Sequence, residues 1–217
     1  MIAIVDYGIG NLRSVEKALR HVGADARLTG DPAEIRAAAG VVLPGVGAFG
    51  ACSLGLRQRA FDRLVLEVAA AGRPLLGICV GMQLLFEESE EMGRHRGLGL
   101  LPGRVVRFPD GGVDASGARL KVPQIGWNQL WHDGRDPLLA GVASGSFAYF
   151  VHSYYCVPAE PTDVIAITDY GLPYASAVHR GNLWGVQFHP EKSHAVGLRI
   201  LRNFVEMVSR SPCSERL

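Results

Sequence analysis

In the first half of the chain, short apolar segments alternate with amphipathic ones, and this alternation restricts the possible folds more than any other feature. Buried strands are predicted at residues 2–6, 25–29, 41–45 and 74–78. Helices are predicted between them at 11–23, 31–40 and 49–72, with a further helix that begins near Cys79. Strands that alternate with helices form a mostly parallel sheet with helices on both faces. The predicted fold class is therefore α/β.

The second half has a different pattern, in which short apolar segments are separated by Gly, Pro and Asp turns. Strands are predicted there at 103–108, 147–157, 164–170, 176–180 and 183–189. We expect these strands to be antiparallel additions to the sheet. A last helix is predicted at 193–209, followed by a frayed tail at 210–217. Because the sequence has no repeat and no linker, residues 1–217 are expected to form a single domain.

Charge and cysteine usage exclude several classes of function. The 22 basic and 21 acidic residues are interspersed and give a net charge of +1, so neither a nucleic-acid partner nor a membrane surface is indicated. No apolar run approaches the roughly 18 residues of a membrane span, and Asp6 interrupts the N-terminal run as no signal peptide would. The four cysteines and seven histidines show no metal-ligand spacing. A cytoplasmic protein with no metal and no cofactor is expected.

The segment "GICVG" (77–81) sets Cys79 between two glycines where a strand becomes a helix. Small flanking residues relieve the strain of a tight strand-to-helix turn, as in the nucleophile elbow of serine hydrolases. At a helix N-terminus, free N–H groups lower a thiol pKa from about 8.5 and favour the nucleophilic thiolate. Cys79 is therefore a candidate nucleophile. The alternative is an inert buried thiol.

A partner for proton transfer is offered by "GVQFHPEKS" (185–193). His189 ends an apolar strand, and Glu191 lies two residues further on, where strand alternation would put it on the same side. An imidazole oriented by a carboxylate is the base of a nucleophilic triad, here in the order Cys, His, Glu. The alternative for this segment is an ordinary surface turn.

The glycine-rich segment "PGVGAFG" (44–50) follows a predicted strand. Such a loop can turn a backbone N–H towards an active site at little steric cost. Together with the N–H of Val80, it could form an oxyanion hole, in which one donor is worth about 3 to 4 kcal/mol in the transition state. The alternative is a common strand-to-helix turn.

These three segments, in this order, resemble the class I (triad) glutamine amidotransferases. Further segments, "DYGIGNL" (6–12), "VPQIGWNQL" (122–130) and "YFVHSYY" (149–155), are similar to the glutaminase subunits of imidazole glycerol phosphate synthase. The resemblance covers residues 2 to about 206. Relatives that serve anthranilate or GMP synthesis tend to have a PGPG- or PGGP-like loop in place of "PGVG". One departure is Gln124, where His is expected more often.

The resemblance implies a three-layer, flavodoxin-like fold and a glutaminase reaction. Cys79 would attack the side-chain amide of glutamine, and His189, held by Glu191, would protonate the departing ammonia and then activate water. Backbone N–H groups at Val46, Gly47 and Val80 would hold the oxyanion. The family positions that contact or line the glutamine pocket are matched by Gln83, Glu91, His152, Ser153 and Tyr154. From the residues alone, these five could equally be surface or strand-edge polar groups.

The resemblance also implies a partner, a cyclase subunit with a (β/α)8 barrel, in a heterodimer. The cyclase would receive ammonia through an internal channel and convert PRFAR to imidazole glycerol phosphate and AICAR in histidine biosynthesis, a lyase activity of the complex. The partner-facing residues would be Asn11, Trp127, Asn128 and Lys192. Trp127 could instead belong to the core, and Lys192 could be an ordinary solvated lysine.

In this family, glutaminase activity is expected to stay low until the cyclase binds its nucleotide substrate. The loop 44–50 would then have to bring its donor into position. We therefore expect Gly47→Pro to abolish activation, because proline removes an N–H and fixes φ. Unchanged ammonia transfer in that variant would contradict this expectation.

Three other functions are compatible with parts of the pattern. A paralogous glutaminase could feed a different synthase, such as one that aminates a sugar. A stand-alone cysteine hydrolase could act on γ-glutamyl substrates without a partner. A catalytically inactive binding module is the third, although all three triad positions are filled.

Overall fold

The computed structural model describes residues 1–114 and 116–211. Its main sheet has eleven strands within this described part, and ten of them follow the order β2-β1-β3-β4-β13-β12-β10-β7-β5-β6, while β11 pairs with β12. Strands β8 and β9 form a separate two-stranded sheet. The five strands at the β2 end are all mutually parallel, in the 2-1-3-4-5 order of flavodoxin-like folds.

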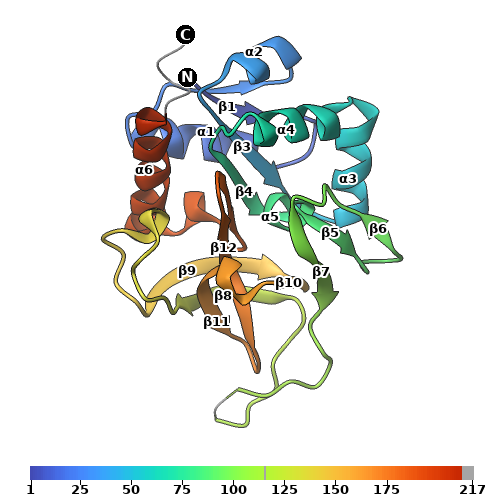
Figure 1. Cartoon of the computed structure of the whole chain (residues 1–217). Coiled ribbons are helices and arrows are strands. Elements are labelled where there is room, and N and C mark those ends of the chain that lie inside the picture. The colour runs from blue at the N-terminus through green and yellow to red at the C-terminus, as the bar shows by residue number, and fades with distance from the viewer. Residues whose placement is uncertain (115, 212–217) are drawn as a thin grey trace.

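The parallel strands are β1 (Ile2–Val5), β2 (Ala26–Thr29), β3 (Gly40–Gly45), β4 (Leu75–Cys79) and β13 (Leu183–Val186). The helices are α1 (Leu12–His21), α2 (Pro32–Ala37), α3 (Phe49–Gln58), α4 (Phe61–Ala70), α5 (Val80–Leu84) and α6 (His194–Arg210). Every residue of β1, β3, β4 and β13 is buried. Figure 1 shows why: α1 and α6 cover one side of these strands, and α3 and α4 cover the other. The α/β prediction with helices on both faces is confirmed.

The helix predicted at 49–72 is two helices. Ala60 has a φ of +55°, in the left-handed region, and this breaks the helix between Gln58 and Phe61. The bend lets the chain place Phe49 and Leu56 of α3 and Leu64 of α4 in one core. The apolar pattern is continuous across Ala60, so periodicity alone could not locate the break.

The second half contains β5 (Phe86–Ser89), β6 (His95–Arg96), β7 (Leu101–Arg107), β8 (Gln124–Leu130), β9 (Ser146–His152), β10 (Tyr154–Pro158), β11 (Val164–Asp169) and β12 (Pro173–Arg180). Antiparallel pairs predominate here, as predicted. The strand predicted at 183–189 is antiparallel to one neighbour, as expected, but differs from the prediction in its end and in its second neighbour. It ends at Val186 and, although antiparallel to β12, it pairs with β4 in parallel, because the hairpin with β12 returns the chain along the central sheet.

The strand predicted at 147–157 is also two strands. Ser153 separates β9, which pairs with β8, from β10, which pairs with β7 in the main sheet. No strand is predicted from the sequence for β8, so the partner of β9 is a finding of the structure. Figure 1 shows β8 and β9 at the end of the molecule away from the N-terminus.

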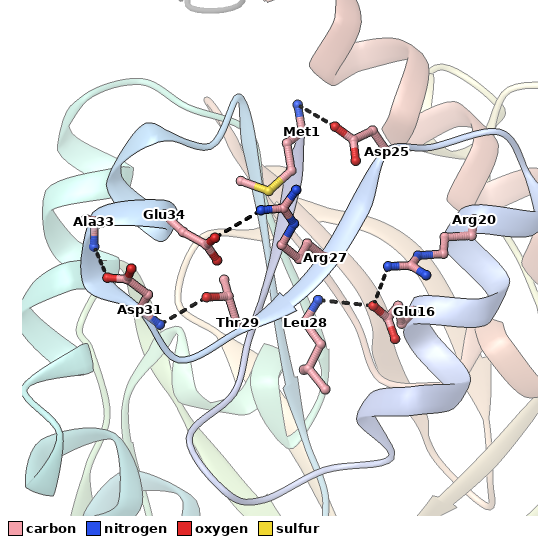
Figure 2. A network of polar contacts seen from close by, with 10 residues as sticks. All are labelled: Met1, Glu16, Arg20, Asp25, Arg27, Leu28, Thr29, Asp31, Ala33 and Glu34. Carbon is pink, nitrogen blue, oxygen red and sulfur yellow. Dashed lines mark hydrogen bonds and ion pairs between the residues drawn. The ribbon is translucent and has the colours of Figure 1, made fainter.

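A polar network holds the helices to the edge strand β2 (Figure 2). The Glu16 carboxylate of α1 accepts the backbone N–H of Leu28 at 3.3 Å. Arg27 of β2 pairs with Glu34 of α2 at 3.0 Å, and Asp31 caps the first turn of α2. Each contact is partly solvated and individually weak, but together they orient two helices on an otherwise open sheet edge.

Two further expectations concern the ends of the chain and membranes. Of the tail predicted at 210–217, Arg210 is the last residue of α6, while 212–217 lie outside the described residues. Across residues 1–114 and 116–211, we find no helix with the length and apolar character needed to cross a bilayer.

Candidate active site

The candidate site lies at the carboxyl ends of three neighbouring parallel strands. In the sheet register, Gly45 at the end of β3 is opposite Cys79 at the end of β4, and Val186 at the end of β13 is opposite Ile78. Open α/β sheets bind ligands at the carboxyl ends of their strands. The glycine-rich loop, the cysteine and the histidine segment are therefore brought to one edge of the sheet.

Cys79 occupies a strained backbone conformation, with φ +55° and ψ −114°. For a residue with a side chain, this costs on the order of 1–3 kcal/mol. Its flanking glycines are required by close packing. A Cβ at Gly81 would lie 1.8 Å from the carbonyl oxygen of Leu43, and one at Gly77 would lie 2.7 Å from the carbonyl oxygen of Gly81. The turn therefore holds the thiol at the point where β4 becomes α5.

His189 and Glu191 form a buried pair. The Nδ1 of His189 lies 2.9 Å from Oε1 of Glu191, which leaves Nε2 for other partners. The strand alternation expected to bring them together is not the cause. β13 ends at Val186, and residues 190–192 form a 3-10 turn that carries Glu191 back onto the ring.

Burial lowers the pKa of His189, but hydrogen bonds and charges from Cys79 and then Glu191 outweigh it and raise this pKa to about 10. The imidazole is therefore protonated at neutral pH. It lies between a sulfur and a carboxylate that both favour its charged form. This arrangement suits a group that gives a proton to a leaving amine.

Strand β9 fixes the backbone of the histidine segment. The backbone N–H of His189 donates to the carbonyl of Tyr149 at 2.9 Å. The Ser193 hydroxyl donates to the carbonyl of His189 at 2.7 Å and accepts the N–H of Tyr149 at 2.9 Å. The position of the imidazole therefore depends directly on the β8–β9 sheet.

The segment 44–50, from the end of β3 to the start of α3, is held at three points. The Tyr7 hydroxyl donates to the carbonyl of Pro44 at 2.7 Å, and the Cys52 thiol donates to the carbonyl of Val46 at 3.3 Å. The Glu91 carboxylate accepts the N–H of Phe49 at 2.6 Å. Gly47 has a φ of +79°, which only glycine adopts without strain.

A cavity of about 270 Å³ connects these groups. It is lined by Asn11, Val46, Gly47, Cys79, Val80, Gln83, Glu91, Val151, His152, Ser153, Tyr154, His189 and Lys192. Of the fifteen site residues predicted from the sequence, twelve are among them, while Glu191 lies behind His189 and Trp127 and Asn128 lie elsewhere. The volume suits a small amino acid.

Polar groups on one wall of the cavity are fixed by the carbonyl of Tyr154. It accepts hydrogen bonds from Nε2 of Gln83 at 3.0 Å and from Nδ1 of His152 at 2.8 Å. Burial lowers the pKa of His152 to about 4, with His189 contributing in the same direction, so His152 is neutral at neutral pH.

Trp127 and Asn128 point to opposite faces of β8. Trp127 is 45% exposed and its ring stacks on His194 with centroids 4.9 Å apart, so it does not belong to the core. Asn128 donates to the carbonyl of Asp169 at 2.7 Å. Lys192 places its ammonium 5.6 Å from the ring centroid of Tyr149, and the same ring lies 6.0 Å from that of Trp127.

No cluster of three or more His, Cys, Asp or Glu side chains suited to a metal ion occurs in the described part of the chain. A larger cavity, of about 1040 Å³, lies among Arg57, Glu88 and Arg94 but includes no residue of the candidate site. Its open, mixed-charge lining lacks a nucleophile. The candidate active site is therefore the cavity of about 270 Å³ that contains Cys79.

A family model described as "Glutamine amidotransferase class-I" matches residues 3–208. The chain belongs to the class-I glutamine amidotransferases. Among curated relatives of this amidotransferase, the "Imidazole glycerol phosphate synthase subunit HisH" of Syntrophotalea carbinolica is 53% identical over 207 residues, which is 95% of this chain and 100% of the relative. The subunit of the same name from Methylococcus capsulatus is also 53% identical, over 94% of this chain and 95% of the relative.

Solved structures support the fold of the amidotransferase. PurLQS from Thermotoga maritima superposes with a TM-score of 0.74 at 18% identity, covering 95% of this chain and 97% of that one. A structure described as a glutamine amidotransferase superposes with a TM-score of 0.72 at 20% identity, covering 96% and 98%. The three-layer class I fold expected from the resemblance is confirmed.

Sequence reasoning missed Gln187, Tyr7 and Cys52 at this amidotransferase site. Gln187 could have been noticed, because it is a polar residue within the otherwise apolar run "LWGVQF". Tyr7 and Cys52 contact the loop through the tertiary fold, and nothing in their local sequence signals this.

Proposed function

We propose that this chain is the glutaminase subunit of imidazole glycerol phosphate synthase and hydrolyses glutamine to glutamate and ammonia. The relatives that carry that name are about half identical over nearly the whole chain, which supports the assignment. The observation that carries the chemistry is Cys79, strained at the carboxyl end of β4 and sharing one cavity with the His189–Glu191 pair.

In the first step, the Cys79 sulfur attacks the side-chain amide carbon of glutamine. The carbon–nitrogen bond breaks, and protonated His189 supplies the proton with which ammonia leaves. Glu191 keeps the ring oriented through Nδ1, so that Nε2 serves the reacting groups. The product of this step is a γ-glutamyl thioester on Cys79.

In the second step, His189 takes a proton from water, which attacks the thioester and releases glutamate. The negative oxygen formed in each step needs donors. We assign them to the N–H of Val80 and to an N–H at Val46 or Gly47, because these residues line the cavity beside Cys79. Since α5 has only five residues, these individual N–H groups matter more here than a helix dipole.

Gln83, Glu91, His152, Ser153 and Tyr154 would hold the glutamine substrate. The side-chain NH2 of Gln83 is engaged by Tyr154, so its oxygen is the atom available as an acceptor. Neutral His152 adds no positive charge beside the substrate. The reaction needs no metal or organic cofactor.

The partner is proposed to be a (β/α)8 cyclase that forms a heterodimer with this chain and takes ammonia through an internal channel. One surface suits such a partner, the β8–β9 face, formed by Ile125, Trp127, Phe147, Tyr149 and Val151. Alternation and the pairs Ile125–Val151 and Trp127–Tyr149 put these side chains on one side of the ribbon. Ile125 is 63% and Phe147 53% exposed, and contiguous apolar exposure is typical of interfaces.

The β8–β9 face is continuous with the active site. Val151 and Lys192 line the cavity, and Tyr149 bonds the His189 backbone. Ammonia released at Cys79 would therefore emerge near the partner. Asn11 lies at the same cavity, whereas Asn128 is turned towards β11 and is not part of this face. A reducing cytoplasm is the expected location, consistent with free thiols at Cys52, Cys79 and Cys156.

Glutamate release from glutamine tests the proposal. It should be measured for the chain alone and with the cyclase subunit and its nucleotide substrate, with Cys79→Ala as the control. We expect strong stimulation by the cyclase and none in Cys79→Ala. Activity that depends on Cys79 but ignores the cyclase would indicate a paralogous or stand-alone glutaminase, and activity that survives Cys79→Ala would refute the mechanism.

A further inference from the structure

Gln187 is a fully buried polar residue between β13 and His189. Its backbone N–H donates to the carbonyl of Ser176 at 2.9 Å, which fixes the main chain. Its side chain extends to the nucleophile, where Nε2 lies 3.7 Å from the sulfur of Cys79. That distance is within the range of a hydrogen bond to sulfur, which is longer than one to oxygen.

The orientation of this amide follows from a chain of contacts that ends at a backbone carbonyl. The carbonyl of Tyr154 can only accept, so the end of the Gln83 amide that faces it must be the NH2 group. The same NH2 group lies 3.1 Å from the side chain of Gln187 and must meet its oxygen there. The NH2 of Gln187 is therefore the end that faces the Cys79 sulfur.

We propose that Gln187 is a positioning residue that donates a hydrogen bond to the Cys79 sulfur and stabilises its thiolate form, and that Gln83 fixes the direction of this donor. The inference rests on the proposed role of Cys79 as the nucleophile. A thiolate accepts hydrogen bonds strongly, whereas a thiol or a thioester sulfur accepts them weakly. Gln187 therefore favours the thiolate before attack and again when water expels it from the thioester.

The other ionisable groups near the sulfur come from four directions. His189 contacts it from the segment just before the 3-10 turn. Tyr7 and Cys52 interact with it from the loop after β1 and from α3, and Cys156 does so from β10. Glu91, His152 and Lys192 line the same cavity. Each of these groups titrates or carries a charge, whereas the side-chain amide of Gln187 is neutral at every pH of the experiment. Replacing Gln187 by a neutral residue therefore removes the donor without changing any charge.

The test is the pH dependence of Cys79 alkylation by iodoacetamide, followed by mass spectrometry of the peptide that contains Cys79. Without the donor, the thiolate forms at higher pH. In Gln187→Met, the pH of half-maximal alkylation rate should rise by about one unit, as expected for the loss of one hydrogen bond to a charged group. In Gln187→Glu it should rise further, because a carboxylate oxygen would face the sulfur. Gln83→Met should give a smaller rise, since Gln187 loses only its orienting partner.

Gln124→Met is the matched control. Gln124 is also a buried glutamine, and its side-chain oxygen accepts from the Tyr174 hydroxyl rather than serving Cys79. Its alkylation profile should match that of the unmodified chain. Thermal unfolding of both Met variants shows whether they are folded. If Gln187→Met does not fold, the alkylation profile of Gln187→Glu, which keeps the shape of glutamine, tests the proposal instead.

An alkylation profile in Gln187→Met or Gln187→Glu that matches Gln124→Met would overturn the proposal, since a merely structural glutamine would not move it. Failure of the proposed function gives a different result. Glutamate release that persists in Cys79→Ala would remove the nucleophilic role, whereas the alkylation profiles would still report on the bond between Gln187 and the sulfur.

Discussion

Two histidines in one cavity have different charge states, and their surroundings explain the difference. His189 contacts Cys79 and Glu191, which raise its pKa to about 10 despite burial. His152 has no acid beside it, and burial lowers its pKa to about 4. The carbonyl of Tyr154 also accepts a hydrogen bond from His152 and favours its charged form, but burial outweighs this bond, whereas the carboxylate of Glu191 carries a full charge beside His189. Residue type alone does not distinguish them.

The charge of His189 should depend on the sulfur. In Cys79→Ala, the pKa of His189 should fall, because the first of the two groups that raise it is removed. NMR titration of the ring carbon resonances measures this directly. His152 serves as an internal reference, with little change expected. A His189 pKa that stays near 10 in Cys79→Ala would mean that Glu191 alone maintains the charge.

His152 should make the protein sensitive to acid. Its pKa lies below the ordinary value of 6.5 only in the folded state, so the unfolded chain binds more protons between about pH 6.5 and 4. Its contribution to stability is therefore lost as the pH falls through this window, by roughly 3 kcal/mol in total. In His152→Gln, the decrease in the free energy of urea unfolding between these pH values should be smaller by about that amount. An unchanged acid dependence would show that His152 is solvated.

At the scale of elements, the sequence predicted the parallel half of the sheet well and the connections less well. The strands that end at Gly45 and Cys79 are buried on both faces, so continuous apolar runs identify them. The break at Ala60 depends on one left-handed residue, and the parallel pairing of β13 depends on a non-local contact with β4. Neither leaves a periodic signal in the sequence.

The turn at Cys79 should be sensitive to a single added methyl group. In Gly81→Ala, the new Cβ would lie 1.8 Å from the carbonyl oxygen of Leu43, so β3 and α5 must move apart. We expect a loss of at least about 3 kcal/mol in the free energy of unfolding, at the upper end of overpacking effects. Gly112→Ala is the control, since its Cβ would be no closer than 3.8 Å to any atom. Equal unfolding midpoints for the two variants would refute the packing argument.

At the scale of the whole molecule, the three motif segments could be placed together from the sequence, because parallel strands bring their carboxyl ends to one edge. What could not be derived is the dependence of His189 on a separate ribbon. The bonds of Tyr149 to His189 and Ser193 arise because β9 lies outside the main sheet and pairs with β8. The β8–β9 face therefore links a surface directly to His189, the proposed general acid.

This link leads to a prediction about assembly. Ile125→Asp places a charge on the β8–β9 face at a side chain that is already 63% exposed, so the isolated chain should lose no more than about 0.5 kcal/mol of stability. Binding to the cyclase subunit should weaken at least tenfold, because a charge in the apolar centre of an interface must be desolvated. Isothermal titration calorimetry measures the affinity, and glutamate release should lose its stimulation in parallel. Leu66→Asp, on α4 and 38% exposed, is the control and should bind normally. If Ile125→Asp binds as tightly as Leu66→Asp, the partner contacts another surface, and the bonds from Tyr149 serve only to hold His189 in place.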